Sequence, residues 1–342
     1  MTTRVTIDRA QSEYEKHLRA RGLAPRSVKS QMQTLNHCRA VWGDTQLVSK
    51  VRPEHLDQLF IYGDWSPNTR NLHLSNLRGF FTWARRNGYV PKDYDPTEGW
   101  RNVRAERKEK TWLPIEQFAD LLNACDDGRD RAIIAIGLFT FMRGSEVSTL
   151  RVRDVDFQRH TVEMYRHKTK QQDVLPLSSE LHRELLTWLN EYELRVNRPL
   201  NPDWYLVPAQ GPLPMTFDFT KRKLQPTGEP SVLRPDTPMG KPYEVVKRAM
   251  RCVGMDPHGS GLHTLRRSGA RALFDRLRHE GYDGALMRVS SMLGHADTKT
   301  TEIYLGLSIE RQQRNELIAG KPMFPDLAAP ATVVSLKEAS GG

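Results

Sequence analysis

The stretch MLGHADTKTTEIYLG, residues 292–306, decides the fold of this chain. Gly294 lets the backbone turn sharply before His295, because glycine adopts unusual backbone angles at little steric cost. A threonine-rich run then leads to Tyr304. A single tyrosine of this kind is more often a core residue than a nucleophile, so its interpretation depends on three motifs that lie upstream.

The nearest of these motifs is HTLRR, residues 263–267. Residues three positions apart lie on the same side of a helix, so His263 and Arg266 are expected to face one way. Arg267 is expected to point elsewhere, as a structural residue or a contact to a backbone.

Two more motifs lie further upstream. RHKTKQQDVLPLS, residues 166–178, predicts a β-hairpin whose polar turn carries Lys168 and Lys170, since alternating apolar residues flank that turn. FMRGSEVSTLRVRDVD, residues 141–156, places Arg143 directly after an apolar run that predicts a buried helix.

Together the four motifs resemble the tyrosine recombinase (phage integrase) family in their order, their spacing and their expected secondary structure. Met142, Arg143, Glu146 and Leu150 match the family's first arginine segment. The Leu-Pro-Leu at 175–177 places the family's hairpin lysine on Lys168, with Lys170 as the alternative. The resemblance implies these catalytic residues: Arg143, Lys168, His263, Arg266, His295 and Tyr304, with Glu146 in a supporting role.

Cleavage of a phosphodiester without metal needs a nucleophile, cations on the non-bridging oxygens, an acid for the leaving oxygen and a base. The resemblance implies that Tyr304 attacks and forms a 3′-phosphotyrosine. Arg143, Arg266 and His295 then bind the phosphate oxygens, because the guanidinium fork matches phosphate geometry. Lys168 is the expected acid and His263 the expected proton acceptor. No cofactor is expected.

The expected fold is mainly α, with a small β-sheet in the catalytic domain. Four amphipathic runs predict a helical core-binding (SAM-like) DNA-binding domain at 1–101. A polar, charged segment at 102–111 is expected to be a basic linker, 112–319 the α+β catalytic domain, and 320–342 a tail. Within the catalytic domain, the proline- and glycine-rich residues 208–240 are expected to form a long irregular insertion.

Charge and composition narrow the class of protein. The net charge is +10 over 342 residues, and residues 1–110 carry 20 Lys and Arg against 12 Asp and Glu. Such a basic first third is typical of a part that binds nucleic-acid phosphates. No apolar run reaches the roughly 20 residues of a membrane span, and a cytoplasmic protein is expected. Three separated cysteines are expected to be reduced thiols, and the histidines, which lack metal-ligand spacing, are not expected to bind a metal.

The resemblance also implies partners. Double-stranded DNA would be held in a clamp by the two domains, and a homotetramer would act on two DNA sites. Accessory DNA-bending proteins are a further expected partner, and a bacterial or mobile-element protein at the nucleoid is the expected setting. The tail 320–342 is a candidate for docking onto a neighbouring protomer through residues 333–336, and residues 309–318 before it are a candidate docking helix.

Two alternatives to a site-specific recombinase remain at this stage. A type IB topoisomerase-like enzyme shares the same active-site chemistry but acts alone and relaxes supercoils. A DNA-binding protein could keep the fold without the reaction, although the complete set of catalytic residues argues against that alternative.

Overall fold

The computed structural model describes residues 3–105, 112–166, 169–212, 214–218, 222–228 and 231–307. The chain forms two compact units, Met1–Glu109 and Lys110–Gly342. Each unit has its own hydrophobic core, so each is described separately. The expectation of a mainly helical fold with small sheets is confirmed.

The first unit contains the four expected helices. Their bounds are α1 Ile7–Ala20, α2 Pro25–Trp42, α3 Pro53–Gly63 and α4 Pro67–Arg86, with a short 3-10 turn at Val48–Lys50. Proline occupies a first helical position in α2, α3 and α4, where its missing N–H costs nothing. Helix α2 therefore begins at Pro25.

Aromatic side chains fill the core of this unit. The ring of Tyr14 on α1 packs 5.4 Å from Phe80 and 5.0 Å from Trp83 on α4. Phe81 is fully buried beside them.

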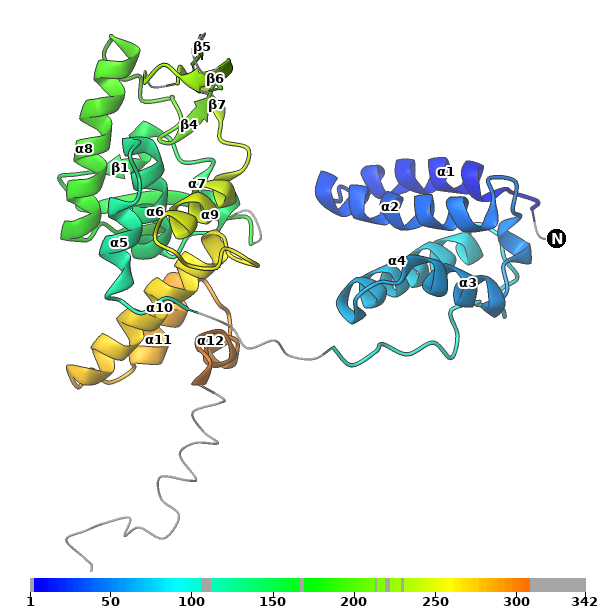
Figure 1. Ribbon diagram of the computed structural model, residues 1–342. Helices are drawn as coiled ribbons and strands as arrows, with labels where there is room; N and C mark the ends of the chain where they lie inside the picture. Colours follow the sequence, from blue (N-terminus) through cyan, green and yellow to red (C-terminus); the bar gives the residue numbers. More distant parts are fainter. Residues whose placement is uncertain are drawn as a thin grey trace, which may run out of the picture. The chain divides into compact units, whose positions relative to one another are not determined.

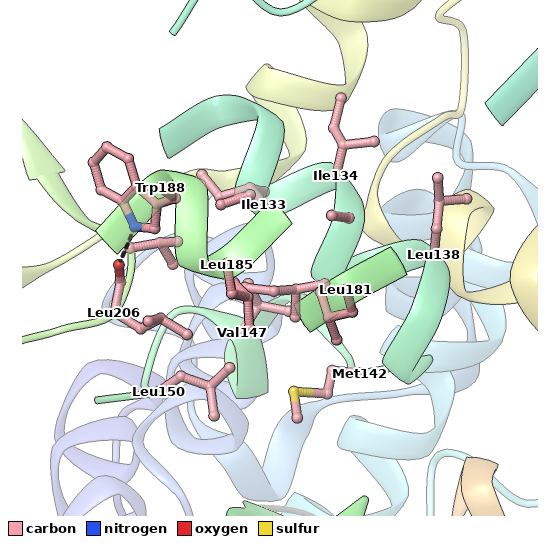
Figure 2. Close-up of a cluster of buried hydrophobic side chains, with 14 of the residues drawn as sticks. Ile133, Ile134, Leu138, Met142, Val147, Leu150, Leu181, Leu185, Trp188 and Leu206 are labelled. Atoms are coloured by element: carbon pink, nitrogen blue, oxygen red, sulfur yellow. Dashed lines mark hydrogen bonds between the residues drawn. The ribbon is translucent and has the colours of Figure 1, made fainter. Parts of the chain in front are cut away.

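The second unit is built around α6, Gly128–Thr140, which is apolar on nearly every side. Such a helix must be covered all round, and α5 Gln117–Asn123, α8 Ser179–Val196, α9 Pro242–Cys252 and α10 Leu262–His279 all contact it. Figure 2 shows side chains of α6 and α8 interlocking in this core, where Trp188 donates a 2.7 Å hydrogen bond to the carbonyl oxygen of Leu206.

Helices α6 and α10 cross at very short range. A Cβ on Gly269 would lie 1.8 Å from the carbonyl oxygen of Leu138, and one on Gly137 would lie 3.0 Å from the side chain of Leu265. Only glycine allows this approach. The crossing brings the start of α10 beside the end of α6, where α7 Gly144–Val147 follows.

The remaining helices of this unit are α11 Ala285–Leu293 and α12 Thr298–Leu305. They lie beside α10, as Figure 1 shows in yellow to orange. Phe141, Phe274, Val289 and Leu305 are buried together in a small second core. This core holds α12, and with it Tyr304, against the rest of the unit.

The hairpin expected around the polar turn is present. β1 Val155–Asp156, β2 Thr161–Arg166 and β3 Gln171–Pro176 form an antiparallel sheet in that order, and Arg166 pairs with Gln171 next to the turn. Inward residues of β2 alternate with exposed ones, as expected of a half-buried strand.

The expectation of an irregular segment at 208–240 is wrong. β4 Pro208–Gln210 pairs with β7 Leu233–Pro238, and β5 Met215–Asp218 pairs with β6 Lys223–Pro226 (Figure 1). Proline in β4, β6 and β7 hid these strands from sequence patterning, since proline cannot donate to a ladder. Two-stranded ribbons tolerate it because each strand has a free edge.

Over the part of the chain that the structure describes, no helix is both long enough and apolar enough to cross a membrane.

Candidate active site

The end of α6 presents Arg143 beside a buried carboxylate. Phe141 takes a left-handed backbone conformation with φ of 58°, which ends the helix and starts a new turn. Glu146 then accepts hydrogen bonds from the backbone N–H of Arg143 at 2.7 Å and from its Nη1 at 2.8 Å. The Glu146 side chain is 1% exposed and that of Arg143 22%. Glu146 therefore orients an arginine that remains partly accessible.

Arg266, near the start of α10, lies deeper. Its side chain is 1% exposed. It donates to the carbonyl oxygens of Phe141 and, at 2.7 Å, of Leu293. Burial lowers the pKa of this guanidinium to about 10, which still leaves it charged at neutral pH. Its Nη1 lies 4.0 Å from a carboxylate oxygen of Glu146, so Arg143 and Arg266 share one carboxylate.

Tyr304 on α12 packs against this cationic group. The guanidinium carbons of Arg266 and Arg267 lie 5.9 Å and 5.8 Å from the centre of its ring. The tyrosine hydroxyl donates to the backbone carbonyl oxygen of His263 at 3.4 Å. Burial raises the pKa of Tyr304 above its usual value of 10.0, and Arg266 and Arg267 oppose that rise.

One histidine side chain borders the tyrosine ring, and a second, His263, lies near Arg266 and Arg143. The imidazole of His295 lies 5.5 Å from the Tyr304 ring in an edge-on arrangement, and its Nδ1 is 2.9 Å from the hydroxyl of Thr301. The pKa of His263 is lowered below 6.5 by partial burial first, then by Arg266 and Arg143. His263 is therefore mostly neutral at pH 7, with a nitrogen able to accept a proton.

The structure thus brings together six of the expected residues: Arg143, Glu146, His263, Arg266, His295 and Tyr304. Lys168 lies outside the described residues. Its alternative, Lys170, is exposed at the end of the hairpin turn with φ of 56°, and its backbone N–H donates to the carbonyl oxygen of Arg166 at 2.8 Å.

The expectation that Arg267 points away from the cluster is wrong. Its guanidinium lies over the Tyr304 ring, at about the same distance as that of Arg266. Residues four positions apart also share a helix face. That spacing relates Arg267 to His263, and it could have indicated this placement.

Sequence reasoning also missed Arg166 on β2. This side chain is 5% exposed and forms an ion pair with Asp173 on β3. It donates to the carbonyl oxygens of Leu293 at 3.2 Å and Met292 at 2.9 Å. Arg166 and Arg266 therefore both bind the end of α11, directly before Gly294 and His295.

Among the described residues, no three His, Cys, Asp or Glu side chains are grouped so as to hold a metal ion.

Known proteins resemble this chain over most of its length. The model of the phage integrase family matches residues 111–311. The tyrosine recombinase XerC of Pseudomonas syringae pv. tomato is 28% identical over 244 residues, which are 69% of each protein. XerC of Thermodesulfovibrio yellowstonii is 25% identical over 276 residues, covering 77% of this chain and 81% of that protein.

Solved structures share the fold. A lambda integrase (75–356) dimer bound to a COC′ core site gives a TM-score of 0.62 at 15% identity, covering 88% of this chain and 95% of that one. The XerH site-specific recombinase bound to palindromic difH gives 0.62 at 19% identity, covering 91% and 85%. Because the family model spans more than half of the sequence, this chain belongs to the phage integrase family.

Proposed function

We propose that the protein is a site-specific recombinase that cleaves and rejoins double-stranded DNA through Tyr304. The observation that carries the proposal is that the Tyr304 ring packs against two guanidinium groups and edge-on to His295, with its hydroxyl on the backbone carbonyl of His263. A phenol packed against fixed cations is arranged for attack on an anionic centre, because the cations neutralise charge that grows in the transition state.

In the proposed reaction, the Tyr304 oxygen forms a bond to the scissile phosphorus while the bond to the 5′-oxygen breaks. The phenol proton leaves, the 5′-oxygen gains a proton, and a 3′-phosphotyrosine results. The 5′-hydroxyl of a partner strand then attacks this ester and releases the tyrosine. The ester conserves the energy of the broken bond, so the reaction needs no nucleotide cofactor.

Each described residue has a proposed role. Arg143 and Arg266 bind the non-bridging oxygens through charge-assisted hydrogen bonds, and Glu146 holds Arg143 in place for that contact. His295 adds a hydrogen bond to the same oxygens. His263, with its lowered pKa, takes the phenol proton. Lys168 remains the proposed acid for the 5′-oxygen.

For the partners, we propose that both units bind duplex DNA and that four copies act on two sites. The basic excess of residues 1–110 supports phosphate binding by the first unit. Relatives of the same fold include a lambda integrase tetramer bound to a Holliday junction. The domain bounds 1–101, 102–111, 112–319 and 320–342 belong to this proposal, as do accessory DNA-bending proteins and action at a bacterial nucleoid. The docking segments at 309–318 and 333–336 lie outside the described residues.

Covalent trapping tests the proposal. Wild-type protein and Tyr304→Phe would be incubated with nicked DNA fragments from the host genome and its mobile elements, and the DNA in SDS-resistant complexes would be sequenced. We expect adducts only with the wild type, at one recurring sequence. Tight binding without any adduct would favour the non-catalytic alternative, and relaxation of supercoils by monomeric protein would favour the topoisomerase-like one.

A further inference from the structure

The end of α12 is fastened at the residues that directly follow Tyr304. The backbone carbonyl oxygen of Leu305 accepts a 3.0 Å hydrogen bond from Nη1 of Arg271 on α10. Gly306 ends the helix with φ of 77°. A helix leaves its last carbonyl groups unpaired, and a cation there is favourable. Arg271 therefore secures the C-terminal end of the short helix that carries the tyrosine.

Trp112 lies against the same point. A Cβ on Gly306 would be 2.8 Å from the Trp112 ring, so the indole packs directly on the glycine backbone. The guanidinium carbon of Arg271 is 5.1 Å from the centre of that ring. Trp112, Arg271 and Gly306 thus form one contact, which we call the α12 clasp.

The clasp is anchored to the helix that carries the two arginines. The backbone N–H of Leu113 donates a 2.8 Å hydrogen bond to the hydroxyl of Ser268, which is fully buried on α10. Arg271 is held on the same helix by a 2.7 Å ion pair with Asp275. Arg266 and Arg267 precede Ser268 in α10. The clasp therefore connects the C-terminal end of α12 to α10, the helix whose arginines lie over the Tyr304 ring.

The contact made by the tyrosine hydroxyl itself is long, at 3.4 Å to the carbonyl oxygen of His263. Helix α12 has only eight residues, and isolated helices of that length are unstable in water. The placement of the phenol thus depends on the small core beneath the helix and on what holds the two ends of the helix. Asp297 caps its N-terminus through the backbone N–H of Lys299 at 2.9 Å, and the clasp holds its C-terminus.

We propose that Trp112, acting with Arg271 through Gly306, is a positioning residue that holds Tyr304 in line for attack. The proposal rests on the proposed function, in which Tyr304 is the nucleophile. Trp112, near the start of the second unit, would thereby hold in place a nucleophile near the end of the described chain. The alternative is that Trp112 is an ordinary core residue, whose removal weakens the whole unit equally.

The experiment compares Trp112→Ala and Trp112→Phe with wild type, in the full-length protein. Trp204→Ala is the matched control, because Arg198 lies 4.5 Å over that ring as well, and Trp204 packs near Tyr192 on α8. Three quantities are measured: the DNA dissociation constant, the single-turnover rate of adduct formation on saturating DNA, and amide hydrogen exchange resolved to α12. Hydrogen exchange needs no activity, so it reports on the clasp even if the reaction proposal fails.

We expect Trp112→Ala to slow adduct formation on the order of 10- to 100-fold, since a misplacement of about 1 Å can cost that much. DNA affinity should change less than about twofold, because the phosphate contacts set it. Exchange in α12 should rise while α6 and α8 keep their protection. Trp112→Phe should recover most of the rate, because a ring still covers Gly306.

Unchanged exchange in α12 would overturn the proposal, as would a rise spread equally over the unit. Trp204→Ala should weaken α8 and leave α12 as in the wild type; loosening of α12 in that control would also count against a specific clasp. If wild-type protein forms no adduct but Trp112→Ala still loosens α12 selectively, the clasp is supported and the recombinase proposal fails. The two failures are therefore distinguishable.

Discussion

Gly294 lies directly against the guanidinium of Arg166: a Cβ built on this glycine would be 2.5 Å from Nη1 of the arginine. Arg166 belongs to β2, and Gly294 ends α11 with φ of 61°. The contact joins the hairpin to the turn that carries His295. Gly294 is thus required for its backbone conformation and also for its lack of a side chain.

This relationship predicts a large cost for Gly294→Ala. The left-handed conformation should cost about 1–2 kcal/mol, and displacement of the guanidinium should add about 1–3 kcal/mol. Gly281→Ala is the control, because Gly281 has φ of 73° and nothing within 4 Å of its Cβ position. Urea unfolding of both variants gives the difference. Equal losses of stability would show that the Arg166 contact contributes nothing.

Removal of the Arg166 charge should also destabilise the second unit. Arg166→Met leaves Asp173 without its buried partner and takes donors from two carbonyl groups, so we expect a loss of about 2–4 kcal/mol. Arg153→Met removes an ion pair with Asp203 whose side chains are 57% and 66% exposed, and it should have almost no effect. Thermal and urea unfolding measure both. A loss below that of Arg153→Met would contradict the structural role of Arg166.

Glu146→Gln should slow adduct formation more than it weakens DNA binding. In this variant an amide N–H₂ group replaces one of the two carboxylate oxygens that accept hydrogen bonds from Arg143. Because that group is itself a donor, it repels a donor of Arg143 and turns the guanidinium away from its position. We expect a rate at least about tenfold lower, which corresponds to about 1.4 kcal/mol in the barrier.

Glu184→Gln is the matched control for that variant. Glu184 is similarly buried and pairs with Arg131 in the same unit, but its ion pair joins α6 to α8. Glu184→Gln should lower the free energy of unfolding without changing the rate of adduct formation per folded molecule. Equal rates for Glu146→Gln and wild type would remove Glu146 from the proposed network.

The pH dependence of adduct formation should reflect His263. The neutral imidazole is the proton acceptor, and its fraction rises with pH. Because partial burial and neighbouring arginines lower the pKa of His263, the rate should rise with pH through a midpoint below 6.5 and level off at higher pH. Single-turnover rates between pH 5 and 8 measure the curve. His263→Ala should lower the plateau and abolish this rise; an unchanged curve would assign the proton to another group.

Much of the fold was predictable from local patterns. Apolar residues at helical spacing located the four helices of the first unit, and alternating residues located the hairpin. The pair β4–β7 escaped prediction because it joins residues far apart in sequence, among them prolines that usually argue against a strand. The hairpin β5–β6 escaped because its strands have only four residues each.

Part of the candidate site was likewise predictable. Motifs carrying Arg143, Glu146, His263, Arg266, His295 and Tyr304 predicted which side chains should gather, and the structure places these residues in one cluster. Their catalytic roles remain predictions. Arg267 was misjudged because only the spacing of three from His263 was considered, although a spacing of four shares the same face.

The sequence by itself determined the helical register, the hairpin and the types of side chain at the site, because these depend on neighbours a few residues apart. Only the tertiary structure decided that Arg166 meets the end of α11, 127 residues away, and that Trp112 meets Gly306. Such contacts leave no local pattern. They arise because α6 and α10 cross closely enough to bring distant segments together, where buried arginines must find carbonyl oxygens or carboxylates as partners.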